Sequence, residues 1–196
     1  MSYFRTQLEQ WLATLDIKAD KVLDCGGGAL PVKNRVKSFC VKEYKILDNE
    51  LEDMKQKPDL KFDLNDSFTN LDKNGIHHFR NAFDLIFCLE VAEYLYRPFQ
   101  ALEHINYLMK KDGVLYISFP FIYPLHNPEG KDMLRYTRWG VEKLLTEAGF
   151  KIDYIKSRVE NEPEMLGAFY AKEGMHPCKR YSKHNEIGYL VRAIKK

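Results

Sequence analysis

At 196 residues the chain is long enough for one domain with a complete hydrophobic core and too short for two comfortable ones. Hydrophobic residues make up 45% and charged residues 30% of it, as in ordinary soluble globular proteins. The net charge of +2, spread over 30 basic and 28 acidic residues, gives no electrostatic argument for a nucleic-acid partner.

The N-terminal half is predicted to contain an amphipathic helix followed by strands. Apolar residues recur at helical spacing at Phe4, Leu8, Trp11 and Leu15, which predicts a helix within residues 1–18. Short apolar runs predict strands over residues 21–24, 44–48, 60–64 and 83–88. A helix is also expected over residues 32–39, because Pro31 is suited to a first helical turn.

The C-terminal half continues the alternation. Pro98 opens a helix with a shared apolar face, and a turn at Asp112 and Gly113 precedes a strand over residues 114–119. Thr137 is a suitable N-cap for a helix that Gly149 ends. Two last strands are predicted over residues 151–155 and 188–194. The irregular segments 120–136 and 159–187 are expected to be substrate-side loops.

Strands that alternate with helices indicate an α/β fold. We predict a doubly wound, mostly parallel sheet with helices on both faces, formed by residues 1–196 as a single domain. In such a sheet, ligands bind beyond the carboxyl ends of the strands. The residues at these ends are therefore the first candidates for a site.

Four successive strand ends carry residues suited to a nucleotide-like ligand. The first strand ends in Asp24 and Cys25 and runs into Gly26, Gly27 and Gly28, and glycines let a backbone approach a ligand closely. Taken alone, this turn fits an ordinary strand-to-helix connection as well. The second strand ends in Asp48, whose carboxylate can accept both hydroxyls of a ribose. The next two strand ends carry further candidates, which are placed to contact the edge of an adenine base: Asp63, Leu64, Leu89 and Glu90.

Taken in order, these segments resemble the class I S-adenosylmethionine-dependent methyltransferases. Residues 22–28 (VLDCGGG) are similar to the first motif, residues 83–93 (FDLIFCLEVAE) to the fourth, and residues 110–115 (KKDGVL) to the turn before strand five. The resemblance implies seven strands with an antiparallel last strand, and S-adenosylmethionine as cofactor. The implied cofactor-binding residues are Asp24, Gly26, Gly27, Gly28, Asp48, Asp63, Leu64, Leu89 and Glu90.

The sequence departs from the family pattern at three places. Leu30 replaces a glycine of the usual spacing, Tyr94 replaces a common histidine, and Lys111 and Asp112 replace a proline-glycine pair. These departures concern the loop geometry rather than the ribose and adenine contacts. An NAD-type fingerprint is disfavoured because Pro31 occupies the position that needs a small residue.

The segment after strand five resembles a subgroup in which a histidine and an Asp-x-x-Arg-Tyr stretch cap the active site. His126 is the candidate catalytic base, since its unperturbed pKa near 6.5 suits proton transfer. It can equally be a strut that is hydrogen-bonded to Asp132 or to a loop carbonyl. Arg135 can clamp an anionic group or form a structural pair with Asp132 or Glu129. The candidate substrate-binding residues are Tyr123, Asp132, Arg135 and Tyr136.

The lack of a recognisable targeting signal and the cysteine usage lead us to expect a cytoplasmic protein. No apolar run is long enough for a membrane span, and the N-terminus lacks the features of a secretory signal. The four cysteines form no Cys-x-x-Cys pair, so free thiols are expected. We predict no membrane partner and no metal site.

The predicted reaction is methyl transfer by in-line displacement to a small-molecule or sugar-like acceptor. Residues 89–92 (LEVA) lack the motif of nucleic-acid amino methyltransferases, which disfavours that acceptor. A protein acceptor is an alternative. So is a methyltransferase-like binding or scaffold protein that no longer catalyses, which Leu30 and Tyr94 favour. The sequence leaves the oligomeric state open.

Overall fold

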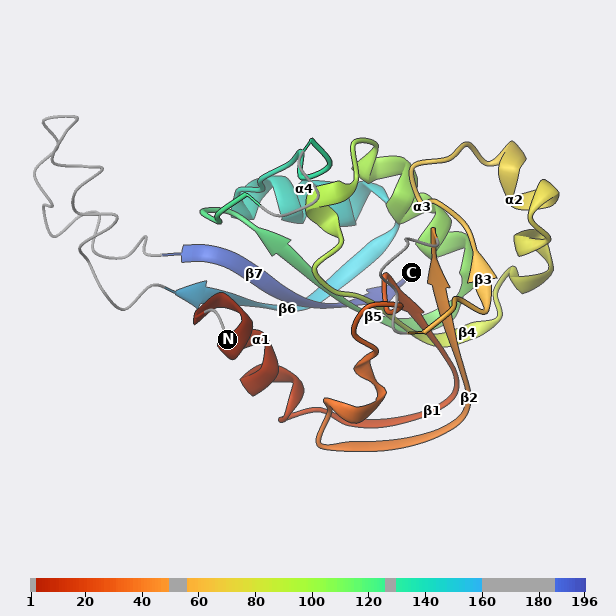
Figure 1. The fold of residues 1–196 in the computed structure, drawn as a ribbon, viewed down its shortest axis with the longest axis horizontal. Coiled ribbons are helices and arrows are strands. Elements are labelled where there is room, and N and C mark those ends of the chain that lie inside the picture. Colours follow the sequence, from red (N-terminus) through yellow and green to blue (C-terminus); the bar gives the residue numbers. More distant parts are fainter. Residues whose placement is uncertain (1–2, 50–55, 126–129, 160–185) are drawn as a thin grey trace, which may run out of the picture.

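The computed structural model describes residues 3–49, 56–125, 130–159 and 186–196. The strands form one seven-stranded sheet in the order β3-β2-β1-β4-β5-β7-β6 (Figure 1). Their bounds are β1 Asp16–Cys25, β2 Ser38–Asp48, β3 Leu60–Lys61, β4 Phe83–Cys88, β5 Met109–Pro120, β6 Phe150–Val159 and β7 Glu186–Lys195. The helices are α1 Tyr3–Leu12, α2 Thr69–Lys73, α3 Pro98–Leu108 and α4 Arg138–Glu147, with short 3₁₀ turns η1 Val32–Asn34, η2 Ile76–Phe79 and η3 Ala92–Tyr94.

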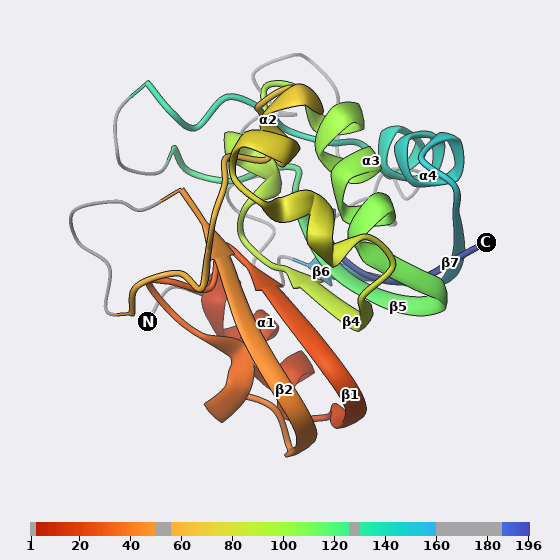
Figure 2. The ribbon, with the colours of Figure 1, turned by 90° about the vertical axis from the view of Figure 1, so that its right-hand side faces the viewer.

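The strand directions confirm the predicted fold class. Strands β1 to β5 pair in parallel, whereas β7 is antiparallel to both β5 and β6, between which it lies. Helices α2, α3 and α4 cover one face of the sheet and α1 lies on the other (Figures 1 and 2). Because the carboxyl ends of β1 to β4 meet at one edge, the predicted candidate residues come from one side of the molecule.

The sheet separates two hydrophobic clusters. On the larger side, Leu102 and Ile105 of α3 and Val141 and Leu145 of α4 are almost fully buried against the strands. On the other side, α1 contributes Leu8, Trp11 and Leu12 to a smaller cluster. The hydrophobic spacing that predicted α1 is therefore explained by burial of one helix face.

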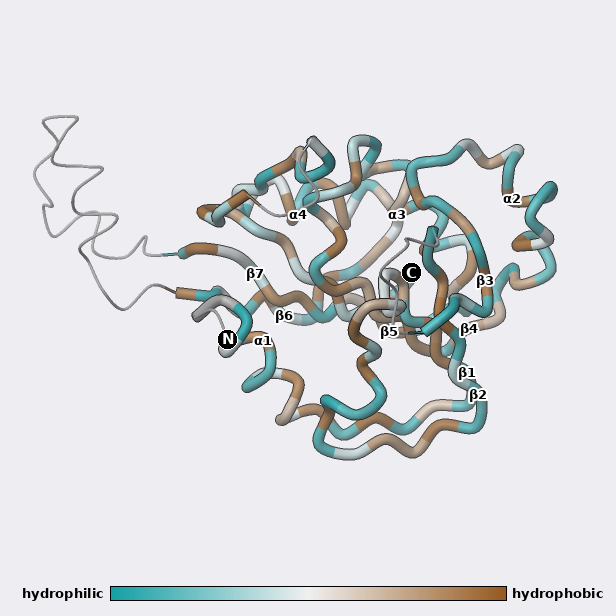
Figure 3. The backbone as a smooth tube through the Cα atoms, viewed as in Figure 1, coloured by the Kyte–Doolittle hydropathy of each residue, from teal (hydrophilic) through white to brown (hydrophobic). Residues whose placement is uncertain are grey.

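The helix predicted over residues 32–39 is wrong. The chain forms only the turn η1 there, and β2 begins at Ser38. The pairing with β1 brings Phe39 beside Ile17 and Val41 beside Ala19. Hydrophobic and hydrophilic residues alternate along the first half of β1 (Figure 3), and exposed and half-buried residues alternate along the first half of β2. Cross-strand pairing of β-branched and aromatic residues thus overrides the weak helical signal of Pro31.

The N-terminal helix is also shorter than predicted. It ends at Leu12, and residues 16–18 already belong to β1, which begins five residues before the strand expected from Lys21. The third strand is shorter as well, since β3 comprises only Leu60 and Lys61. The periodic apolar signal therefore located each of these elements without setting its ends.

Local signals in the C-terminal half are confirmed. Thr137 Oγ1 accepts a hydrogen bond of 3.2 Å from the Gly140 backbone nitrogen and so caps α4. Gly149 follows the helix with φ of +86°, a conformation that favours glycine. At the predicted turn, Asp112 has φ of +61°. Within the described part of the chain, no helix has the length and apolar character needed to cross a bilayer.

Candidate cofactor cleft

A cleft of about 550 Å³ opens at the carboxyl ends of β1 to β4. This volume is in the range of small-molecule sites. Five of the residues predicted to bind the cofactor line it, namely Gly26, Asp48, Asp63, Leu64 and Glu90. The remaining lining residues are Ala29, Leu47, Asn49, Phe62, Asn65, Val91, Tyr94, Leu95, Tyr96, Lys131 and Met133.

The glycine turn packs tightly against its neighbours. Gly26 has φ of +78°, and a Cβ atom at this position would lie only 2.3 Å from Cγ2 of Val91. Its backbone nitrogen donates a 2.8 Å hydrogen bond to the Leu47 carbonyl. A Cβ on Gly27 would lie 2.6 Å from Cγ of Asp24. Gly26 is thus required where the turn meets the cleft, whereas Gly27 accommodates a side chain beneath the turn.

Asp24 lies beneath the turn rather than at the cleft surface. It is 3% exposed, and its carboxylate accepts hydrogen bonds from the Tyr44 hydroxyl and, at 2.8 Å, from the Val32 backbone nitrogen. Burial raises the pKa of Asp24 to about 6, although both hydrogen bonds act in the opposite direction. Asp24 therefore supports the turn from within the fold.

Two carboxylates at the cleft are oriented by backbone amides. Asp48 Oδ2 accepts a hydrogen bond of 3.1 Å from the Gly28 nitrogen, and its Oδ1 accepts one of 2.8 Å from Asn49. Asp63 Oδ1 accepts from the backbone and side-chain nitrogens of Asn65, at 2.8 and 3.1 Å. An ionised carboxylate has about four acceptor positions, so both groups keep capacity for a ligand's hydroxyl or amine.

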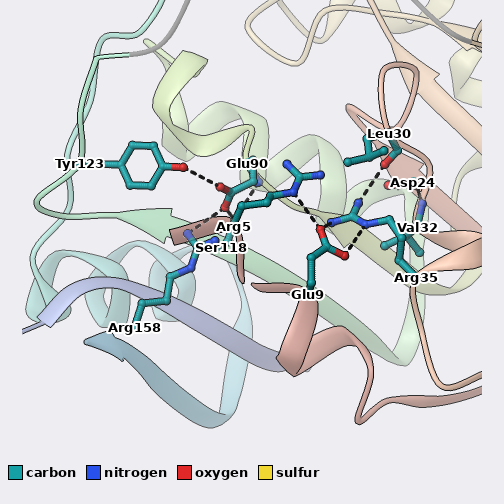
Figure 4. A network of polar contacts seen from close by, with 10 residues as sticks. All are labelled: Arg5, Glu9, Asp24, Leu30, Val32, Arg35, Glu90, Ser118, Tyr123 and Arg158. Atoms are coloured by element: carbon teal, nitrogen blue, oxygen red, sulfur yellow. Dashed lines mark hydrogen bonds and ion pairs between the residues drawn. The ribbon is translucent and has the colours of Figure 1, made fainter. Parts of the chain in front are cut away.

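Leu30 is held in place from the N-terminal helix. Arg35 donates to its carbonyl at 2.9 Å and forms a two-point ion pair with Glu9 of α1, at 2.8 and 3.0 Å (Figure 4). Arg5 donates to the same Glu9 at 2.8 Å. The loop after the glycine turn is thus anchored by side chains at the position where the family pattern has a glycine.

Glu90 carries the most elaborate polar environment at the cleft. Its Oε1 accepts from Ser118 of β5 at 2.8 Å and from Arg158 of β6 at 2.9 Å, and its Oε2 accepts from the Tyr123 hydroxyl at 3.3 Å (Figure 4). The Arg158 guanidinium helps to keep the pKa of Glu90 below its usual value, even though burial raises it. By contrast, Leu89 belongs to the hydrophobic cluster beside α1 and does not line the cleft.

The segment around Asp132 and Arg135 forms an anchored roof. The Arg135 guanidinium is paired with Asp132 and donates to the carbonyls of Tyr123, Pro124 and Leu134. These contacts join the stretch after β5 to the stretch before α4. They favour the structural interpretation of Arg135 over an anion clamp.

The roof is also bound to the turn η3. The backbone nitrogens of Met133 and Leu134 donate to the Glu93 carbonyl at 2.8 and 3.1 Å. The buried Tyr136 hydroxyl donates to the Ala92 carbonyl at 2.7 Å. The predicted residues of this segment therefore hold it in place, whereas their neighbours Lys131 and Met133, which sequence reasoning missed, line the cleft. The predicted base His126 lies outside the described residues.

Other residues that sequence reasoning missed come from separate strands. Ser118 and Arg158 belong to no local motif, and only the sheet topology brings them to Glu90. The signal for Tyr94 and Tyr96 was present in the sequence, because both follow the fourth strand end within a few residues.

No protein-family model and no curated protein matches the sequence. Solved structures do match, and one is an S-adenosylmethionine-dependent methyltransferase from Mesorhizobium loti, with a TM-score of 0.64 and 13% identity over 98% of both chains. A methyltransferase from Archaeoglobus fulgidus gives 0.59 and 17%, over 98% of this chain and 92% of that one. The [4+2]-cyclase SpnF gives 0.56 and 17%, over 98% and 80%. The chain thus has the Rossmann-like methyltransferase fold.

Proposed function

We propose that this chain is an S-adenosylmethionine-dependent methyltransferase that acts on a small-molecule or sugar-like acceptor. The observation that carries the proposal is the order of the polar residues along the sheet. Asp63 follows β3, Asp48 ends β2, Gly26 follows β1 and Glu90 follows β4, and all four line one cleft. Since these strands are neighbours in that order, an extended ligand across their ends meets the four residues in sequence.

The residues present fit the three parts of this cofactor. Phe62 and Leu64 give an apolar surface for adenine, beside the Asp63 carboxylate. Asp48 is suited to the ribose hydroxyls, because it lines the cleft and two backbone amides hold its carboxylate in a fixed orientation. The methionine part would then lie between Gly26, where the backbone has no side chain in the way, and Glu90.

When bound, the cofactor supplies a methyl group that its sulfonium already activates. The side chains of this chain therefore need to align the acceptor with that methyl group and to exclude water. Tyr94, Tyr96 and Met133 are placed to cover the bound pair, and the exposed Lys131 adds a cation at the roof. We propose that Tyr123, Asp132, Arg135 and Tyr136 serve the acceptor by holding this roof.

His126 keeps two proposed roles. As a base it would take a proton from a hydroxyl or amine acceptor, and as a strut it would hold the roof. An asparagine at this position separates the two, because an amide keeps hydrogen-bonding capacity but cannot act as a base. Loss of turnover in His126→Asn with unchanged cofactor affinity supports the base, whereas intact turnover with every acceptor tested excludes it.

Calorimetric titration with S-adenosylmethionine and S-adenosylhomocysteine tests the cofactor. Both are expected to bind the wild type, and Asp48→Asn should weaken both by about ten-fold through loss of a charge-assisted contact. Asp153→Asn is a matched control, because Asp153 is a surface carboxylate on β6 that pairs with Arg192. Absence of binding of either compound to the wild type would overturn the proposal. An acceptor screen with methyl-labelled cofactor then identifies the substrate class.

Two alternatives remain distinguishable from this proposal. One of the solved structures with this fold is a [4+2]-cyclase, so the fold by itself does not require methyl transfer. The alternative of a methyltransferase-like binding or scaffold protein that no longer catalyses is therefore kept. Cofactor binding with no label transfer to small molecules, sugars or proteins would support that alternative. Label transfer to protein alone would support a protein methyltransferase.

A further inference from the structure

The buried ion pair of Glu90 and Arg158 joins residues of two strand regions that are not neighbours in the sheet. Arg158 lies on β6, is 1% exposed, and reaches a glutamate that follows β4. Between these strands lie β7 and β5. Neighbouring strands are about 4.8 Å apart, so the long arginine side chain is needed to span the distance.

Gly188 of β7 leaves room for this crossing. It pairs directly with Arg158 on one side and with Pro120 on the other. A Cβ atom on Gly188 would lie 3.4 Å from Cδ of Arg158 and 2.8 Å from the Phe119 carbonyl oxygen. The stem of the arginine therefore passes over β7 at a residue without a side chain.

Glu90 itself is held in an unusual backbone conformation. Its φ is +56°, and its backbone nitrogen donates a 2.7 Å hydrogen bond to Ser118 Oγ, the same hydroxyl that donates to its carboxylate. Positive φ is unfavourable for a glutamate, and a buried ion pair adds little to folding stability by itself. Stability therefore does not explain this arrangement, and a role of Glu90 at the cleft does.

We propose that Arg158 is a positioning residue that holds Glu90 as a fixed anion at the methionine end of the cleft. This inference rests on the proposed function. Glu90 is one of the residues that line the cleft, whereas Arg158 is 1% exposed and does not line it. A fixed negative charge there favours S-adenosylmethionine, whose sulfur is cationic, over S-adenosylhomocysteine, whose sulfur is neutral. The amino acid end is the same in both compounds, so the ratio of their affinities isolates the sulfur.

Among the residues that the structure describes, the side chains that contact or charge-couple to Glu90 favour its ionised form. Arg158 of β6 and Arg5 of α1 are cations, and the hydroxyls of Ser118 and Tyr123 donate to it. Removal of the Arg158 charge should let burial raise the pKa of Glu90, so that its ionisation falls within an accessible pH range. Selectivity for the cationic ligand should then depend on pH in the variant and not in the wild type.

The experiment measures dissociation constants of both ligands by calorimetry from pH 6 to 9. In Glu90→Gln, the preference for S-adenosylmethionine should fall by about ten-fold at every pH. In Arg158→Met, the preference should be low at pH 6 and recover as pH rises. Arg158→Lys keeps a cation and should retain most of the preference at neutral pH. The control Asp48→Asn should weaken both ligands equally and leave the ratio unchanged.

An unchanged affinity ratio in Glu90→Gln would overturn the inference. So would a ratio in Arg158→Met that matches the wild type at every pH. If Arg158→Met fails to fold, the Arg158→Lys and Glu90→Gln results decide, since both keep a hydrogen-bonding group at the altered position. A wild type that binds neither ligand refutes the proposed function itself, and that result is distinct from binding with an unchanged ratio.

Discussion

Replacing Gly26 by alanine tests the tightest packing at the cleft. The new methyl group would adopt a backbone with φ of +78° and would lie 2.3 Å from Cγ2 of Val91. The positive φ costs about 1 kcal/mol for an L-residue. Displacing Val91 costs a further 1–3 kcal/mol or so, as is typical of overpacking. We therefore expect the free energy of unfolding to fall by about 2–4 kcal/mol.

Gly130 supplies a matched control for the backbone contribution. Its φ is +79°, and a Cβ atom there would meet nothing within 4 Å. Gly130→Ala should therefore cost only about 1 kcal/mol. Urea denaturation of both variants measures the difference, which isolates the contact with Val91.

A double variant tests whether the contact with Val91 causes the loss of stability in Gly26→Ala. Val91→Ala in the Gly26→Ala background should recover much of the contact energy, because the clashing methyl group is gone. The reasoning is refuted if Gly26→Ala and Gly130→Ala lose the same stability, or if Val91→Ala recovers none of it. In either case the turn would not be packed against the loop after β4 as the structure has it.

Three further predictions concern the folded state. The pKa of Asp24 is raised to about 6 in the folded protein, from about 4 in the unfolded chain, so the free energy of unfolding should fall as pH rises between those values. The expected fall is about 2–3 kcal/mol in the wild type, and it should be absent in Asp24→Asn. Urea denaturation from pH 4 to 7 measures it. An identical slope in both proteins would contradict this. Arg135→Met should cost about 1–3 kcal/mol and increase proteolysis of the roof, because the Asp132 side chain, 2% exposed, loses its ion pair with Arg135. Unchanged protease resistance would show that the roof does not depend on the pair. Thr137→Ala should cost about 1 kcal/mol by thermal unfolding, since the Gly140 amide loses its cap, and Thr137→Ser should retain most of it.

The strand ends were predictable from sequence because their signals are local. A short apolar run followed by glycine or a carboxylate marks the end of a buried strand, and Gly26 and Asp48 were located in this way. The cap at Thr137 and the left-handed Gly149 are likewise encoded within a few residues. These elements needed no knowledge of the tertiary structure.

Features that depend on strand pairing were not predictable in the same way. The stretch over residues 32–39 has no strong preference of its own, and β2 begins there because β1 offers Ile17 and Ala19 as partners. Arg158 belongs to no sequence motif. It reaches Glu90 only because the strand between β6 and β5, β7, has a glycine at the position that pairs with Arg158. Around Arg135, the pattern located the roof but did not single out Lys131 and Met133, which line the cleft. A charged pair in a loop can serve either a ligand or the loop itself, so the sequence alone does not separate these roles.

The position of β7 has a consequence for how the chain reaches its final form. The strand latest in the sequence inserts between β5 and β6, both of which precede it. Until residues 186–195 leave the ribosome, the apolar β5, with Ile117 and Phe119, lacks one hydrogen-bonding neighbour. Contacts of such large sequence separation form slowly, and an unpaired apolar edge invites association with other chains. Synthesis of this protein should therefore be most vulnerable to aggregation just before its last strand is available.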